Sequence, residues 1–108
     1  MKIIQNKILP IGKRFYAINL CGVLFAKGPC SERIINHEGI HSRQIFELLI
    51  LPFYILYVLE WIIKLILYRD FYLAYQNISF EREAYQNESD LNYLKRRKPF
   101  NFIRYYKN

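Results

Sequence analysis

The two histidines of this chain lie four residues apart, and a glutamate directly follows the first of them. His37, Glu38 and His41 thus form the pattern H-E-x-x-H. Residues i and i+4 share one face of a helix, so two imidazoles in this pattern can bind a single Zn²⁺ ion. The glutamate beside the first histidine is placed to take a proton from a water at the metal. The sequence therefore predicts one Zn²⁺ per chain, with His37 and His41 as ligands and Glu38 as the catalytic base.

A third zinc ligand must come from a later segment of the chain. Catalytic zinc normally has three protein ligands, and there is no third histidine, so a carboxylate or a cysteine has to serve. Residues 80–85 are dense in acidic side chains and lie far enough along the chain to return antiparallel to the histidine helix. Glu81 and Glu83 point to different faces of one helix, so at most one of them is expected to bind the metal. The other interpretation is an exposed charged face that also includes Arg82 and Glu88.

The histidines require a helix with one inward face. Ser31 is a good N-cap, and Glu32 in the first turn suits the helix dipole. We expect a helix from about residue 32 to 51, on which both histidines lie along an apolar stripe. Gly39 costs about 1 kcal/mol in a helix interior relative to Ala, which indicates that something packs or binds close to the backbone there.

Breaker and cap residues predict the remaining elements. Pro52 ends or kinks the first helix, and Asp70 and Ser79 are candidate N-caps for later helices. Aromatic and β-branched residues on both sides of a glycine predict two short strands or one bulged strand before the histidine helix. The expected elements are strands within 15–20 and 23–26, helices at about 53–68 and 71–89, the second either continuous or kinked at 77–79, and a short last helix that starts at 89–90 and runs through 93–95.

Composition indicates one folded domain, residues 1–108, of the α+β class and mostly α-helical. A hydrophobic fraction of 53% over 108 residues excludes a disordered chain. The net charge of +7 is concentrated in part in a basic, aromatic tail, about residues 95–108. Such a tail suits an anionic membrane surface, with nucleic acid the less favoured partner. Alternatively, it is a solvated terminal segment whose aromatic side chains pack back on the core.

Residues 48–68 are strongly apolar and allow three interpretations. The longest uncharged run is too short for a typical membrane span, and Glu60 and Lys64 stand at i and i+4, which favours an amphipathic helix packed in a core. Association with a membrane interface and a true span remain as alternatives. No secretory signal is visible at the N-terminus, so a cytoplasmic location, with possible membrane association, is expected.

These motifs resemble those of the gluzincins, zinc peptidases with H-E-x-x-H on one helix and a glutamate ligand on a later one. Membrane-linked gluzincins often carry E-x-x-A-D on the later helix. Residues 81–85 here match E-x-x-A, with Tyr85 where the aspartate is usual. The chain is also similar, from about residue 15 to 107, to a family of small bacterial proteins. Those proteins share the patterns INHE-x-IH-x-RQ, PFYI and ISFEREAY, found here at residues 35–44, 52–55 and 78–85.

The resemblance implies a zinc metallopeptidase with an identifiable set of site residues. Glu81 is implied as the third ligand, with Glu83 as its alternative, and Tyr85 and Arg43 are possible groups around the ligands. The strand region before the histidine helix resembles the zincin edge strand that binds a peptide or protein substrate by β-addition. The residues implied for this substrate strand are Asn19, Leu20, Cys21 and Gly22.

The short chain leaves two other functions open. Larger gluzincins close their cleft with a C-terminal subdomain, so this chain implies an open groove, a protein partner that closes it, or a homo-oligomer. One alternative function is a catalytically inactive zinc-binding module that acts in interactions. The other is a small basic protein associated with a membrane surface, in which the H-E-x-x-H pattern is accidental.

Overall fold

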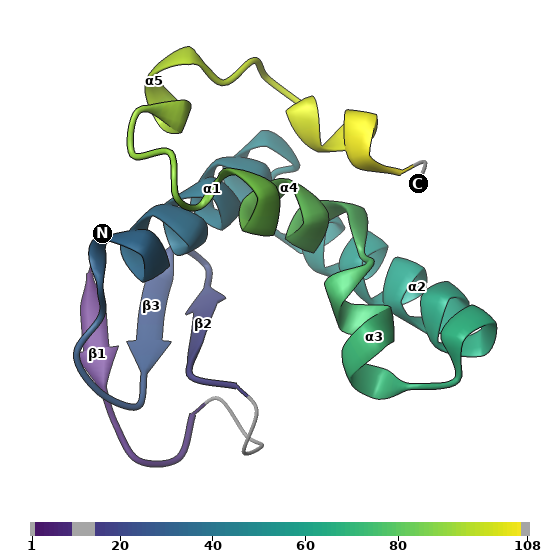
Figure 1. The fold of residues 1–108 in the computed structure, drawn as a ribbon, viewed down its shortest axis with the longest axis horizontal. Helices are drawn as coiled ribbons and strands as arrows, with labels where there is room; N and C mark the ends of the chain where they lie inside the picture. Colours follow the sequence, from purple (N-terminus) through teal and green to yellow (C-terminus); the bar gives the residue numbers. More distant parts are fainter. Residues whose placement is uncertain (1, 10–14, 107–108) are drawn as a thin grey trace.

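The computed structural model describes residues 2–9 and 15–106, which form an α+β fold that is mostly helical, as the sequence predicts (Figure 1). The sheet and the α2–α3 pair lie on opposite sides of the view, and α1 and α4 lie between them. The elements in chain order are β1 (Ile3–Gln5), β2 (Ala17–Leu20), β3 (Val23–Ala26), α1 (Glu32–Glu47), α2 (Leu51–Tyr68), α3 (Phe71–Gln76), α4 (Ser79–Asn87), α5 (Tyr93–Arg96) and the 3₁₀ helix η1 (Asn101–Tyr105).

The sheet has the order β1-β3-β2. β2 and β3 form the predicted strand pair as an antiparallel hairpin, with Ala17 opposite Ala26 and Leu20 opposite Val23. Cys21 and Gly22 make the turn, both with positive φ (55° and 90°), the backbone geometry of tight hairpin turns. β1, which the sequence analysis does not predict, pairs with β3 in parallel. β1 and β2 are therefore the two edge strands of the described sheet, and β2 is the edge nearer α2 and α3 (Figure 1).

The histidine helix α1 begins as predicted and ends earlier than predicted. The Ser31 hydroxyl accepts a hydrogen bond from the backbone N–H of Ile34 (3.2 Å), so Ser31 is the N-cap. The helix ends at Glu47 rather than near residue 51, because Leu49 and Ile50 adopt positive φ values of 60° and 72° and turn the chain. Pro52 does not end α1; it lies in the first turn of α2, where its missing N–H has no helical partner to lose.

The predicted helical stretch over 71–89 is divided into two helices, α3 and α4, at residues 77–78, where the kink was expected. Asp70 caps α3, since its carboxylate accepts hydrogen bonds from two backbone N–H groups of the first turn, at 2.9 and 3.0 Å. The prediction of Ser79 as an N-cap is wrong, because Ile78 occupies that position and Ser79 is the first helical residue. The break after Asn77 turns α4 back across α1 (Figure 1).

Glu60 faces inward rather than toward a surface lysine. Its side chain accepts hydrogen bonds from the backbone N–H and the hydroxyl of Ser79, both at 2.6 Å. Only 7% of Glu60 is exposed, so its i, i+4 spacing to Lys64 does not place it on the exposed face of the helix. The two donors replace the water that a buried carboxylate loses, and they fix α2 against the start of α4.

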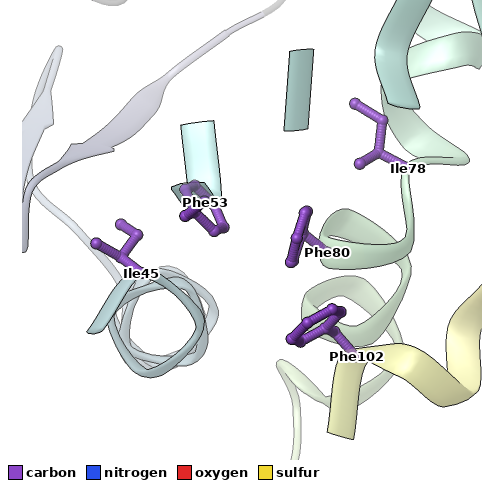
Figure 2. Close-up of a cluster of buried hydrophobic side chains, with 5 residues drawn as sticks. All are labelled: Ile45, Phe53, Ile78, Phe80 and Phe102. Carbon is purple, nitrogen blue, oxygen red and sulfur yellow. The ribbon is translucent and has the colours of Figure 1, made fainter. Parts of the chain in front are cut away.

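The main core lies where α1, α2, α4 and η1 meet. Phe80 contacts Phe53 and Phe102, with ring centroids 4.7 and 4.6 Å apart. The tail thus packs back on the core through Phe102. At Gly39, an added Cβ would come within 3.0 Å of Leu94 Cδ1, so the close packing expected there is provided by α5. The buried residues of the main core are Ile45, Phe53, Ile78, Phe80 and Phe102 (Figure 2).

A buried ion cluster attaches the C-terminal segment to α1 and α4. The Arg97 guanidinium donates to both carboxylate oxygens of Glu83, at 2.5 and 3.1 Å, and to both of Glu47, at 2.7 and 3.0 Å. Arg97 is 9% exposed, so the basic run of residues 95–98 is not a uniformly solvated surface. The cost of burying the Arg97 guanidinium is offset by its bidentate hydrogen bonds to two carboxylates.

We expect Arg97→Ala to lower the free energy of unfolding by about 3–5 kcal/mol, because it leaves the carboxylate of Glu83 buried without its cation. The matched control is Lys98→Ala, at an exposed neighbour, which should stay within about 0.5 kcal/mol of the wild type. Urea unfolding followed by circular dichroism measures both. Equal stabilities for the two variants would contradict a structural role for the cluster.

Candidate metal centre

Both histidines direct the same ring nitrogen at one carboxylate oxygen. The Nε2 atoms of His37 and His41 lie 3.2 and 3.0 Å from Oε1 of Glu81. α1 supplies the histidines one helical turn apart, and α4 brings the glutamate across from the other side of the interface. All three side chains are buried, with exposed fractions of 7% or less.

The spacing of these atoms suits a zinc ion. Zn²⁺ binds imidazole nitrogen and carboxylate oxygen at about 2.0–2.2 Å, so two ligand atoms of a tetrahedral site lie roughly 3.3 Å apart. The two nitrogen–oxygen distances to Glu81 are close to that value. Ligand atoms of His37, Glu38 and His41 also lie within 4.8 Å of one another. The donor set of two imidazoles and one carboxylate is therefore one that zinc prefers.

The other ring nitrogens are held by hydrogen-bond acceptors. Nδ1 of His37 lies 3.1 Å from Oε1 of Glu88, and Nδ1 of His41 lies 2.8 Å from Oε1 of Gln44. In the neutral tautomer whose Nδ1–H donates to its acceptor, each Nε2 would present a lone pair to a metal ion on the Glu81 side. The Glu81 carboxylate is itself positioned by the Tyr57 hydroxyl, which donates to its Oε2 at 2.6 Å.

These three orienting residues were not assigned such roles from the sequence. Glu88 follows Glu81 by seven residues, or two helical turns, and Gln44 follows His41 by three, so both spacings carry a usable signal. Tyr57 lies on α2, and no motif connects it to the histidines. The expectation of an exposed charged face at Glu81, Glu83 and Glu88 is wrong, since all three are buried.

Glu38 lies beside the histidines, whereas Glu83 does not. Oε2 of Glu38 is 3.9 Å from Nε2 of His37, and the side chain is buried. The backbone carbonyl of Glu38 accepts a hydrogen bond from Asn19 Nδ2 at 2.8 Å, which ties the motif to the edge strand β2. Glu83 instead contacts Arg97 and Gln44 on the other side of α4.

The two other residues implied by the resemblance lie outside the donor set. The Tyr85 ring packs against His37, with centroids 4.6 Å apart, but its hydroxyl is directed to Tyr75 at 3.1 Å. Glu88, not Tyr85, therefore holds the imidazole of His37. Arg43 is exposed, two residues beyond His41 and so on the opposite face of α1.

Mutual contacts shift the pKa values of the cluster. Burial alone would raise the pKa of Glu81, but the two imidazoles hold it well below its usual range. Burial likewise opposes the charge on His37, yet hydrogen bonds to Glu81 and Glu88 raise its pKa to about 10. The pKa of His41 is raised as well, by the nearby Glu81 carboxylate acting against burial. Burial raises the pKa of Glu38, against the two imidazoles.

An apolar pocket of about 410 Å³ opens between β2 and α2 and reaches the cluster. Asn19 and Leu20 line it from the end of β2, while Cys21 and Gly22 lie in the hairpin turn beyond it. The Cys21 N–H donates to the Tyr54 hydroxyl at 2.7 Å. The pocket is lined by Leu9, Phe15, Ala17, Ile18, Asn19, Leu20, Glu38, His41, Phe53, Tyr54, Tyr57, Val58, Trp61, Tyr75 and Glu81.

A second pocket, of about 190 Å³, lies on the His37 side of the cluster and is more polar. Arg33, Tyr85 and Glu88 line it, and it shares Phe15, Ala17, Glu38 and Tyr75 with the first pocket. The two pockets therefore meet at Glu38 and at the start of β2, and the first pocket continues along β2. An extended chain laid beside β2 would pass Glu38 with an apolar pocket on one side and a charged one on the other.

Comparison of the chain with models of protein families, with curated proteins and with solved structures returns no match.

The raised pKa of His37 predicts how metal-free protein responds to pH. Its folded pKa of about 10 exceeds the ordinary 6.5, so the protonated imidazole stabilises the fold fully below pH 6.5 and progressively less as pH rises toward 10. We expect the Tm of chelator-treated protein to fall over this interval. Zinc-loaded protein, whose ligand imidazoles are neutral, should hold its Tm. Thermal melts followed by circular dichroism test this, and a constant Tm after chelation would contradict it.

We expect Glu88→Gln to weaken zinc binding about tenfold, because the neutral amide holds His37 less firmly and makes its imidazole a weaker donor. Ser89→Ala, at an exposed neighbour, is the control and should bind as the wild type does. Competition with a chromophoric chelator measures both affinities. Equal zinc affinities for the two variants would show that Glu88 does not contribute to zinc binding.

Proposed function

We propose that this protein is a zinc-dependent metallopeptidase that hydrolyses peptide bonds. The observation that carries the proposal is the convergence of both histidine Nε2 atoms on one oxygen of Glu81, with each Nδ1 already held by an acceptor. Such a buried set of two imidazoles and one carboxylate, together with a neighbouring glutamate, fits a catalytic zinc site better than a purely structural ion cluster.

Zinc held by His37, His41 and Glu81 would supply a Lewis acid that polarises the scissile carbonyl and makes water acidic near neutral pH. Glu38 would take the proton of the attacking water and later pass it to the leaving amine. The hydrogen bond from Asn19 to the Glu38 carbonyl would keep this base at a fixed distance from the edge strand. β2 would align the substrate backbone, so that the scissile bond lies at Glu38.

The buried groups around the ligands support a site prepared for metal. Each proposed ligand has a second polar atom that is held by a neighbouring side chain. Glu88 holds Nδ1 of His37 and Gln44 holds Nδ1 of His41. Tyr57 holds Oε2 of Glu81. Preorganised ligands of this kind reduce the cost of ordering side chains when the ion binds. The pockets beside Glu38 leave room for a substrate on both sides of the base.

The decisive test compares two isosteric variants of α1. Glu38→Gln should keep about one zinc per chain but lower cleavage of a fluorescent peptide library by about 10²–10⁴-fold, the contribution of a general base. Glu32→Gln, at an exposed position on the same helix, should retain full activity. Zinc is counted by mass spectrometry of the dialysed protein.

The possible outcomes separate the competing functions. Zinc in the wild type without any cleavage would indicate an inactive zinc-binding module, and activity retained in Glu38→Gln would exclude Glu38 as the base. Glu81→Ala should lose zinc. If its zinc content equals that of the wild type, the third ligand is assigned wrongly.

A further inference from the structure

The solvent-exposed face of α2 is apolar, whereas the exposed face of a helix is usually polar. In a surface helix the exposed face is polar and the buried face apolar. Here every exposed side chain of the helix is apolar, and the carboxylate of Glu60 points inward to Ser79. The exposed residues of α2 are Leu51, Pro52, Ile55, Leu56, Val58, Leu59, Ile62, Ile63, Ile66 and Leu67.

This face is large and continuous with apolar residues at both ends. α2 is long and apolar enough to cross a membrane by length and composition, and only 11% of it is buried. The helix packs in the core as expected, but by one face only, through Phe53. Phe46 and Leu49 extend the face before the helix, with exposed fractions of 55% and 81%, and Phe71 extends it afterwards, with 71%. Apolar surface of this extent on a soluble monomer marks a binding surface.

The distribution of charge favours an anionic partner. Most of the acidic side chains are turned inward, since Glu38, Glu60, Glu81, Glu83 and Glu88 are all buried. Most of the basic side chains in the described parts of the chain are exposed, with Arg97 the buried exception. The exposed cationic residues in the described parts of the chain are Lys2, Lys7, Arg33, Arg43, Arg69, Lys95, Arg96, Lys98 and Arg104. Two of them, Arg43 and Arg69, lie in the sequence within three residues of Phe46 and Phe71, the apolar residues at the two ends of the face.

We propose that the outward face of α2 docks on an anionic lipid surface, with the helix lying in the plane of the membrane. An apolar helix face flanked by cations is the combination that binds such surfaces, through buried apolar area and attraction to anionic headgroups. A second copy of the chain is a poorer occupant, because two chains that each carry a net charge of +7 would repel each other.

The inward contacts of α2 favour this shallow placement over a span. Its other face packs in the core cluster through Phe53 and carries Glu60 and Tyr57, which bind Ser79 and Glu81. Lipid can therefore reach only one side of the helix. The apolar pocket is lined by Tyr54, Val58 and Trp61 of the same helix, so docking would hold the pocket beside the lipid surface.

Vesicle sedimentation with the full chain tests the proposal independently of any peptidase activity. Wild-type protein should sediment with phosphatidylcholine vesicles that contain phosphatidylglycerol, and much less with pure phosphatidylcholine. Leu59→Gln should reduce binding at least about tenfold, since it removes one inserted side chain. The matched control is Leu91→Gln, because Leu91 has the same exposed fraction, 52%, outside α2. It should bind as the wild type does.

Three results would overturn the proposal. One is wild-type protein that stays in the supernatant with anionic vesicles. Another is equal loss of binding in the Leu59→Gln and Leu91→Gln variants at unchanged helix content. The third is a wild-type dimer that Leu59→Gln converts to a monomer, as measured by analytical ultracentrifugation, because the face would then be covered by a second copy.

Discussion

The arrangement of the helices depends on one buried contact, the Glu81 carboxylate held between His37 and His41. Removing a carboxylate from water costs several kcal/mol unless charged or hydrogen-bonding groups replace the water. α1 provides two of those groups and Tyr57 of α2 provides a third. Three helices are thus fixed around a single side chain. The path of α3 follows, since it connects the end of α2 to the start of α4.

Gln44 joins this cluster to the ion cluster of the C-terminal segment. Its Oε1 accepts from His41, and its Nε2 donates to the Phe80 carbonyl and to Glu83. Glu83 in turn binds Arg97. The amide therefore has a defined orientation, with its acceptor toward the histidine and its donor toward the carboxylate. A disturbance on the Arg97 side can reach the imidazole of His41 through this one residue.

Local signals in the sequence predicted the elements that carry the cluster. Ser31 and Asp70 cap helices as expected, because capping depends on a few neighbouring residues. The i, i+4 spacing of the histidines predicted their common face, and both side chains are buried. The position of Glu81 beside them followed from a motif on a later helix. The zinc ion itself remains a proposal.

Other features depend on long-range packing that local patterns do not encode. Glu60 and Lys64 have the spacing of a surface pair, but the unpaired groups of Ser79 at the start of α4 attract the carboxylate inward. β1 pairs with residues 21 positions later in the sequence, Ile3 with Leu24, through a parallel contact with no turn signal. One residue of the basic run 95–98, Arg97, is buried because the carboxylates of Glu47 on α1 and Glu83 on α4 both bind it.

The position of Glu81 also has a topological consequence. A metal ion bound to His41 and Glu81 would close a loop of forty residues, in a chain whose two cysteines, Cys21 and Cys30, are free thiols. Such a closure restricts the unfolded ensemble in the way a disulfide does, and more so for a long loop. The ion would then cross-link the chain in addition to its proposed role in catalysis. The lifetime of the folded protein would depend on the metal supply of the cell.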